Sequence, residues 1–300
     1  MKILISGSSG QVGSALIPAL ARERHEVWRL LRLKEKPAQD PRVILWNPDA
    51  AELQKEALEG FDAIIHLGGV NLASKRWSEP FKQEAWNSRV ESTRLLVKAM
   101  SALKKPPKVF LCASAVGIYG NRAEEALDDY ASLGSGFLAE LCKAWEESAA
   151  KATTKGVRVI HARFGMILSR QGGAIARMLT PFKLGLGGRI GSGKQIISWI
   201  SLPDLVAALL FLLENDNCEG AYNLVTPNPV SNYNFTRALG RAVARPTIFP
   251  MPAFVARWLL GEMADELLLA SQKVQPKRLK EAGYKFKLPY IGEALARVLE

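Results

Sequence analysis

Three glycines near the N-terminus have the spacing of a phosphate-binding turn. Gly7, Gly10 and Gly13 follow an apolar run and precede a stretch with helical apolar spacing, Val12 to Leu20. In this order, glycines allow a sharp turn, a close approach of backbone to a pyrophosphate, and tight packing of helix on strand. The helix N-terminus then offers free N–H groups to the phosphates. We predict a dinucleotide site formed by Gly7, Gly10, Gln11, Val12 and Gly13.

The end of the second predicted strand, 25–32, indicates which dinucleotide binds. NAD-binding folds usually end this strand in an acid that accepts a hydrogen bond from the ribose 2′-OH. This chain has Arg32 there, followed by Lys34 and Lys36. A guanidinium can hold a 2′-phosphate that a carboxylate would repel. We therefore predict NADP(H) with Arg32 as the clamp. Arg29 is a second candidate, and the alternative is a solvated basic loop.

Strand and helix patterns alternate through the first two-thirds of the chain. Apolar runs predict further strands at 43–46, 61–69, 108–113 and 157–163, with helices at 80–103 and 136–151. Such alternation is typical of an α/β Rossmann-type, doubly wound parallel sheet with helices on both faces. Ligands of such sheets bind outside the carboxyl ends of the strands.

The alternation breaks after Leu168. A glycine-rich segment covers 172–193, strands are predicted at 196–200 and 221–225, and Ser201 with Asp204 predicts the start of a helix reaching Leu213. The rest is mainly helical, with proline breaks. We expect a dinucleotide-binding domain at 1–170, with 196–225 adding to it. A small, mainly helical C-terminal substrate lobe then comprises 171–195 and 226–300.

Composition narrows the classes of partner. The net charge is +11, but no basic run is interleaved with aromatics, so we expect no nucleic acid. No apolar stretch is long enough to cross a bilayer, and we expect no membrane partner. Three scattered cysteines suit a reducing compartment, the cytoplasm. The expected partner is a small-molecule substrate.

Two other patterns are considered and set aside. Gly188 to Lys194 has the spacing of an ATP-binding phosphate loop, but Gln195 replaces its Ser or Thr and a strand-like run follows it. A nucleotide hydrolase is thus the weakest hypothesis. The three histidines, His25, His66 and His161, lack ligand spacing, so no metal site is predicted.

The whole chain resembles the epimerase-family group of atypical short-chain dehydrogenases/reductases, relatives of the nucleotide-sugar epimerases. The segments that carry the resemblance are 7–13, 75–77, 88–89, 114–120, 145–146, 181–188, 191–195, 198–200, 261–263, 272–274 and Pro276. The resemblance implies NADP(H) binding. Carried over residue by residue, it implies that the cofactor meets Leu31, Arg32, Leu67, Gly68, Glu84, Arg89 and, near the nicotinamide, Ile167.

The chain departs from this family where the family does its proton chemistry. Nucleotide-sugar epimerases use a Tyr-x-x-x-Lys helix and a Ser or Thr. Alignment on Lys143 places Ala139 at the tyrosine, whereas alignment on Glu146 places Leu138 there and Cys142 at the lysine. The candidate substitutes are Tyr119, Ser114, Lys143 and Tyr130.

Two hypotheses follow. The first is an NADP(H)-binding oxidoreductase or epimerase-like enzyme that lacks the usual proton shuttle. The second is a non-enzymatic NADP(H)-binding module that senses redox state or regulates a partner.

Overall fold

The core of the molecule is a seven-stranded parallel sheet. A computed structural model describes residues 1–33 and 40–300. The strands lie in the order β11-β7-β5-β4-β1-β2-β3, so the chain winds outward in both directions from β1. This confirms the doubly wound sheet. The bounds are β1 Lys2–Ser6, β2 Glu26–Arg32, β3 Val43–Trp46, β4 Ala63–His66, β5 Val109–Ala115, β7 Arg158–Phe164 and β11 Gly220–Leu224.

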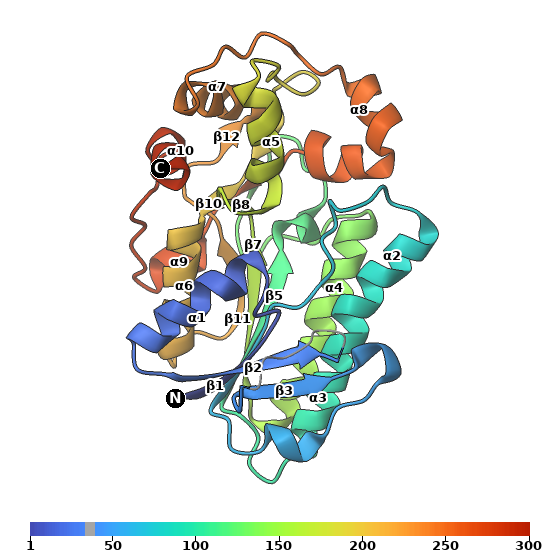
Figure 1. Cartoon of the computed structure of the whole chain (residues 1–300), viewed down its shortest axis with the longest axis vertical. Helices are drawn as coiled ribbons and strands as arrows, with labels where there is room; N and C mark the ends of the chain where they lie inside the picture. The colour runs from blue at the N-terminus through green and yellow to red at the C-terminus, as the bar shows by residue number, and fades with distance from the viewer. Residues whose placement is uncertain (34–39) are drawn as a thin grey trace.

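Helices cover both faces of this sheet (Figure 1). One face carries α1 Gln11–Arg22 and α6 Leu202–Glu214; the other carries α2 Glu79–Trp86, α3 Ser92–Ser101 and α4 Phe137–Ala150. The helix predicted at 80–103 is present, but a π-helical turn at Asn87–Glu91 separates α2 from α3. Ser201 caps α6 by accepting a hydrogen bond from the Asp204 N–H, as predicted.

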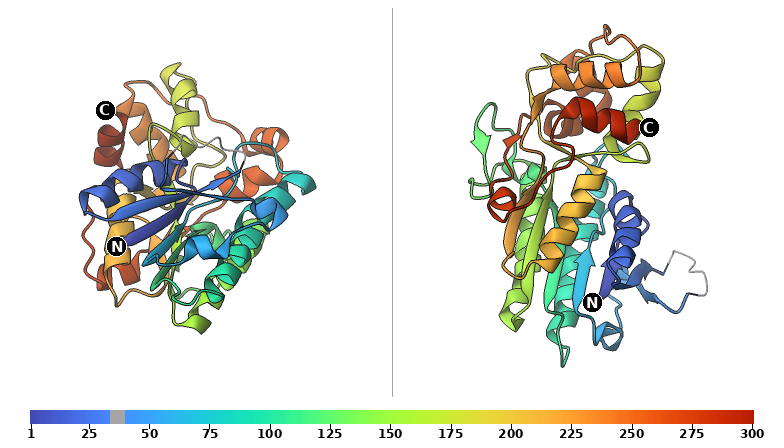
Figure 2. Two further views of the ribbon diagram at one scale, coloured as in Figure 1. Left: turned by 60° about the horizontal axis from the view of Figure 1, so that its bottom comes forward. Right: turned by 90° about the vertical axis from the view of Figure 1, so that its left-hand side faces the viewer.

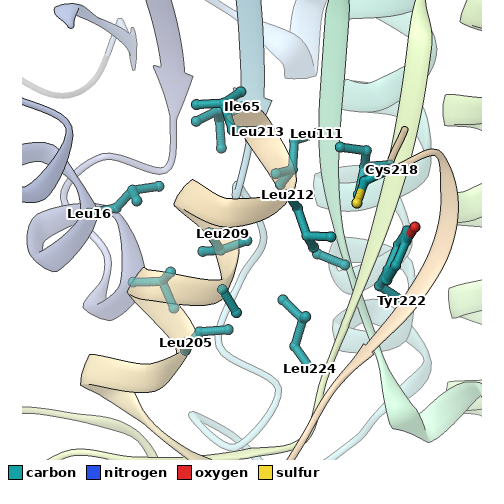
Figure 3. Close-up of a cluster of buried hydrophobic side chains, with 14 of the residues drawn as sticks. Leu16, Ile65, Leu111, Leu205, Leu209, Leu212, Leu213, Cys218, Tyr222 and Leu224 are labelled. Carbon is teal, nitrogen blue, oxygen red and sulfur yellow. The ribbon is translucent and has the colours of Figure 1, made fainter. Parts of the chain in front are cut away.

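The leucines of α6 explain why this helix packs so firmly on the sheet. Leu205, Leu209, Leu212 and Leu213 are all buried, and Figure 3 shows them facing side chains of α1, β4, β5 and β11. Each fully buried leucine contributes about 2 kcal/mol of hydrophobic free energy. The packing of α1 and α6 on the same face of the sheet therefore fixes the position of the glycine turn, which leads into α1.

The C-terminal lobe caps the carboxyl edge of the sheet (Figures 1 and 2). It has its own apolar core, which includes Leu179, Phe182, Trp199, Phe235 and Leu295. Its helices are α5 Gly173–Lys183, α7 Asn232–Ala242, α8 Ala253–Leu260, α9 Lys277–Glu281 and α10 Ile291–Leu299, with a π-helical turn at Ala264–Leu269.

Short strands tie this lobe together. The run predicted as one strand at 196–200 is two, because β9 Ile196–Ile197 pairs with β12 Val230–Ser231 while β10 Trp199–Ser201 pairs with β8 Met166–Leu168. The buried Ser198 between them donates its hydroxyl to the Gln272 carbonyl. Of the segment 196–225, only β11 joins the main sheet. A last pair joins β6 Ala126–Leu127 to β13 Lys273–Val274.

Candidate dinucleotide-binding site

The glycine turn after β1 packs backbone against backbone. Gly7 has a φ of 69°, and a Cβ there would lie 2.7 Å from the Leu67 carbonyl oxygen. A Cβ at Gly13 would lie 2.4 Å from the Gly7 oxygen. Real Cβ atoms do not approach this closely, so both positions need glycine for the fold itself.

Gly10 differs because its open side faces solvent. A Cβ there would meet only the Gly7 oxygen, at 3.2 Å, and the residue is exposed at the N-cap of α1. Beside it Ser8 is 4% exposed, and its hydroxyl has no hydrogen-bond partner within the described chain. A buried hydroxyl without a partner is costly, and a phosphate oxygen would satisfy it. The turn therefore fits a pyrophosphate.

Neighbouring strands bring the other predicted residues to the same edge. Ser6, which precedes the glycine turn, pairs with Leu30 of β2 on one side and with His66 of β4 on the other. Leu31 and Arg32 thus end β2 beside the turn, and Leu67 and Gly68 leave β4 beside it. Arg32 is half-buried and Leu31 is buried. Lys34 and Lys36 lie outside the described residues.

Arg89 lies behind the loop that follows β4. Its guanidinium donates to the Val70 carbonyl at 2.9 Å and stands 5.3 Å from the Trp145 ring, and a Cβ at Gly69 would lie 2.9 Å from the guanidinium carbon. Within residues 1–33 and 40–300 it has no carboxylate partner at ion-pair distance. Burial lowers its pKa to about 10. A buried cation without an acid is a natural anion site.

His66 lies at the end of β4 beneath this edge, where the charges of Arg32 and Arg89 act on its imidazole. Burial, with smaller contributions from the charges of Arg32 and Arg89, lowers its pKa to about 3. Its ring is held between the Ser6 and Ser92 hydroxyls. A neutral histidine here adds no further positive charge to that of the two arginines.

The remaining two cofactor candidates are less decisive. Glu84, on α2, is exposed and lies 3.8 Å from the Lys75 ammonium. Ile167 is the middle residue of β8 and packs against the apolar cluster under α6. Both remain predictions as cofactor contacts.

Tyr119, the first candidate for a proton donor, has no free face. It is 0% exposed; its hydroxyl accepts from Arg163 at 2.8 Å and donates to the Asn223 amide oxygen at 2.8 Å. Burial raises its pKa, against the opposing effect of Arg163. A hydroxyl held in this way cannot reach a substrate, so we correct its role to a structural one.

Ser114 belongs to the same buried network. Its hydroxyl donates to Glu146 at 2.7 Å, and Arg163 binds both carboxylate oxygens of Glu146 at 2.8 Å. The arginine outweighs the opposing effect of burial and lowers the pKa of Glu146. The network therefore ties β5, α4 and β7 together rather than facing a ligand.

The structure shows which residues of α4 face inward. Lys143 faces solvent on α4, 4.0 Å from Glu147, so it is not placed as a catalyst. Leu138 and Cys142 face inward and are buried. They occupy the inner positions that the alignment on Glu146 gives to tyrosine and lysine. Tyr130, the fourth candidate, is 68% exposed.

An apolar cluster covers the position of the missing tyrosine. Leu138 is buried with Trp77, Phe81 and Met263, the last of these coming from the C-terminal lobe. Glu266 of the same lobe accepts the Phe137 and Leu138 N–H groups at 2.8 Å.

Sequence reasoning missed two features of the site. The first is the unpartnered Ser8, whose hydroxyl inside a phosphate-binding turn is a signal that the glycine spacing alone does not express. The ion pair of Arg163 with Glu146 joins residues on separate elements, and only the likeness of 145–146 to relatives hinted at it.

The other motifs have no ligand geometry. Gly188 to Lys194 leads into β9 and not into a helix. Throughout 1–33 and 40–300, His, Cys, Asp and Glu side chains do not gather in threes as metal ligands do. In the same residues no helix combines the length and the apolar character needed to span a bilayer.

Comparison with known proteins identifies the family. A family model described as NAD dependent epimerase/dehydratase family matches residues 3–224. The chain belongs to this family. A second model, a domain of unknown function designated DUF1731, matches residues 251–298 within the C-terminal lobe.

Relatives of full length extend this result. Epimerase family protein ML0860 from Mycobacterium leprae is 44% identical over 98% of this chain and 94% of its own. The chloroplastic SDR39U1 homolog from Arabidopsis thaliana is 36% identical, covering all of this chain and 87% of its own. A crystal structure of human epimerase family protein SDR39U1 (isoform2) with NADPH superposes with a TM-score of 0.91, at 34% identity over 99% of both chains. The resemblance and the Rossmann-type fold are thus confirmed.

Proposed function

We propose that this chain binds NADP(H) and uses it in oxidoreductase or epimerase-like chemistry on a small molecule. The observation that carries the cofactor assignment is the pair of cations, Arg32 and Arg89, beside an open glycine turn; among residues 1–33 and 40–300, no carboxylate lies at ion-pair distance from Arg89. The NADPH of the similar human structure supports it. Residues 1–170 would hold the dinucleotide, and 171–195 with 226–300 would help hold the substrate.

Each residue of the edge has a physical task in this proposal. The N–H groups of the turn and the Ser8 hydroxyl would bind the pyrophosphate, while Arg32 would pair with the 2′-phosphate. Arg89 would hold a phosphate or ribose oxygen behind Gly69. When bound, the nicotinamide supplies or takes up a hydride.

The proton would then travel by another route than the Tyr-x-x-x-Lys shuttle of nucleotide-sugar epimerases. Leucine cannot exchange a proton, and burial raises the pKa of Cys142 to about 11. Neither residue serves as an acid or base near neutral pH. We infer that the proton comes from water or from the substrate lobe. The three buried free cysteines suit a reducing compartment, and the cytoplasmic location stays a prediction.

The test is a comparison of cofactors by calorimetry. NADPH should bind more than about tenfold more tightly than NADH, because a charge-assisted pair contributes about 1.5–3 kcal/mol. Arg32→Ala should remove this preference and leave NADH affinity unchanged. The control is Arg94→Ala, an exposed arginine of α3 paired with Glu91. A preference that survives in Arg32→Ala would contradict the clamp.

One observation favours the second function, a non-enzymatic NADP(H)-binding module. In the alignment on Glu146, Leu138 and Cys142 stand at the shuttle positions; both are buried, and Met263 of the C-terminal lobe lies in one apolar cluster with Leu138. A screen of carbonyl and nucleotide-sugar substrates for NADPH oxidation separates the two functions. Tight NADPH binding without any turnover would favour the sensing role.

A further inference from the structure

The C-terminal lobe contains a long stretch of sequence without acids. Residues 171–195 and 226–261 contain no Asp or Glu. They carry eight cations: Arg177, Lys183, Arg189, Lys194, Arg237, Arg241, Arg245 and Arg257. The whole chain has a net charge of +11, so these two segments carry most of it and the rest of the chain carries only +3. A field of one sign attracts an anionic partner.

The same segments expose large apolar side chains. Helix α8 buries only Ala256 and leaves Phe254 72% and Trp258 76% exposed. Leu184, Leu186, Ile248 and Phe249 are each more than half exposed. We call these six residues the apolar tip. Single exposed apolar residues are ordinary, whereas a contiguous set marks a binding surface.

Backbone contacts bring the two loop segments of the tip side by side, next to the start of α8. The Phe249 N–H donates to the Gly187 carbonyl at 3.4 Å, and the Met251 N–H donates to the Arg189 carbonyl at 2.8 Å. Arg245 donates to the Lys183 carbonyl at 2.9 Å, which places both cations at the end of α5. Helix α8 starts directly after this pairing. In Figure 1, α8 and the loop that leads to it lie at the opposite end of the molecule from β3 and α3.

We propose that the apolar tip docks this protein on an anionic lipid surface. Aromatic and aliphatic side chains that protrude among exposed lysines and arginines suit the boundary between headgroups and acyl chains. Lys183, Arg189 and Arg245 flank the tip and would meet lipid phosphates. The expectation of no membrane partner rests on the lack of a segment that crosses a bilayer. Docking on the surface of a membrane does not require such a segment.

Charge and side-chain type distinguish this partner from others. A second copy would bring like charges together across the interface. Single-stranded nucleic acid binds by stacking on aromatics, and half of the tip is aliphatic. An acidic protein would satisfy the charges equally, but side chains three-quarters exposed stand out from the surface and suit insertion into a fluid layer. The proposal does not depend on cofactor binding.

The test is co-sedimentation of the whole protein with vesicles. We expect binding to phosphatidylcholine vesicles with about 30% phosphatidylglycerol, and loss of binding on pure phosphatidylcholine or in about 0.5 M salt. The paired changes Phe254→Ser/Trp258→Ser and Lys183→Glu/Arg189→Glu should each weaken binding by about tenfold or more. NADPH affinity and melting temperature should stay unchanged, which separates this result from a failure of the proposed function.

A matched control uses exposed apolar residues elsewhere. Tyr130 and Leu133 of the dinucleotide-binding part are 68% and 41% exposed, and Tyr130→Ser/Leu133→Ser should bind vesicles like the parent. No binding to anionic vesicles at low salt would overturn the proposal. So would equal binding by the tip variants, or binding of an oligonucleotide or a second copy through the tip in place of lipid.

Discussion

At the scale of single residues, the three glycines of the turn have different duties, and substitution should separate them. Gly10→Val places a side chain where the pyrophosphate would lie, so NADPH binding should be lost while the melting temperature changes by only a few degrees. Gly13→Val meets backbone at 2.4 Å and should fail to fold or lose several kcal/mol of stability. Calorimetry and thermal unfolding distinguish the two outcomes. A folded Gly10→Val protein with normal NADPH affinity would place the cofactor elsewhere.

His66 makes the stability of the protein depend on pH. Burial lowers the pKa of His66 in the folded protein to about 3, whereas its pKa in the unfolded chain is about 6.5. Between these two pH values His66 is protonated in the unfolded chain and neutral in the folded protein. The free energy of unfolding should therefore fall as pH drops below 6.5, by up to about 1.4 kcal/mol per pH unit from this residue. Urea unfolding between pH 7 and pH 5 measures it. His66→Gln should be less stable at pH 7 but show a flatter pH dependence.

At single positions, features with a local sequence signal could be predicted, whereas contacts between distant residues could not. Glycine spacing and the strand-two arginine are local signals, so the glycine turn and the place of Arg32 beside it could be predicted. The hydrogen bonds of Tyr119 were not, since Asn223 and Arg163 lie 104 and 44 residues away in the chain. A tyrosine near a strand end has the same sequence signature whether its hydroxyl faces a ligand or a buried arginine.

At the scale of elements, the alternating pattern predicted the central strands because each is a short apolar run bounded by turns. The interruption of the predicted strand at Ser198 could not be predicted, because Ile196 to Ile200 is apolar except for this one serine. Its hydroxyl is needed by the β13 segment, where it accepts the Val274 N–H at 2.9 Å. Tertiary partners, rather than local preference, split this strand in two.

The start of α4 depends on an acid from the other lobe. Glu266 accepts two N–H groups in the first turn of α4, where a negative charge also interacts favourably with the helix dipole. Glu266→Ala should lower the free energy of unfolding by about 1–2 kcal/mol, with Glu266→Gln in between. Thermal unfolding measures this, and Glu293→Ala, an exposed first-turn acid of α10, is the control. Equal effects of Glu266→Ala and Glu293→Ala would show that the cap contributes nothing special.

At the scale of the whole molecule, the two lobes share one polar framework. Arg278 of α9 donates to the Ala221 carbonyl of β11 at 2.7 Å, and Thr226 donates to the Pro289 carbonyl at 2.9 Å. The C-terminal segment therefore crosses back over the sheet-bearing part instead of forming a separate unit. Boundaries drawn from composition at 170, 195 and 225 could not anticipate this return, because the contacts join side chains to distant backbone carbonyls that no sequence pattern marks.

Asp204 is the centre of that return and gives the sharpest test of it. It is 1% exposed, caps α6 with Ser201, and accepts the Lys287 and Leu288 N–H groups at 2.8 and 2.9 Å. Asp204→Asn would turn one acceptor into a donor facing an N–H group. The free energy of unfolding should fall by about 2–3 kcal/mol, the loss expected for a buried charged hydrogen bond. Amide exchange at Lys287 and Leu288 should quicken by about tenfold or more, because their local opening no longer breaks those bonds. Asp216→Asn, a fully exposed acid just beyond the end of the same helix, is the matched control and should change neither quantity. Unchanged exchange at both amides in Asp204→Asn would show that the tail is held by its apolar contacts alone.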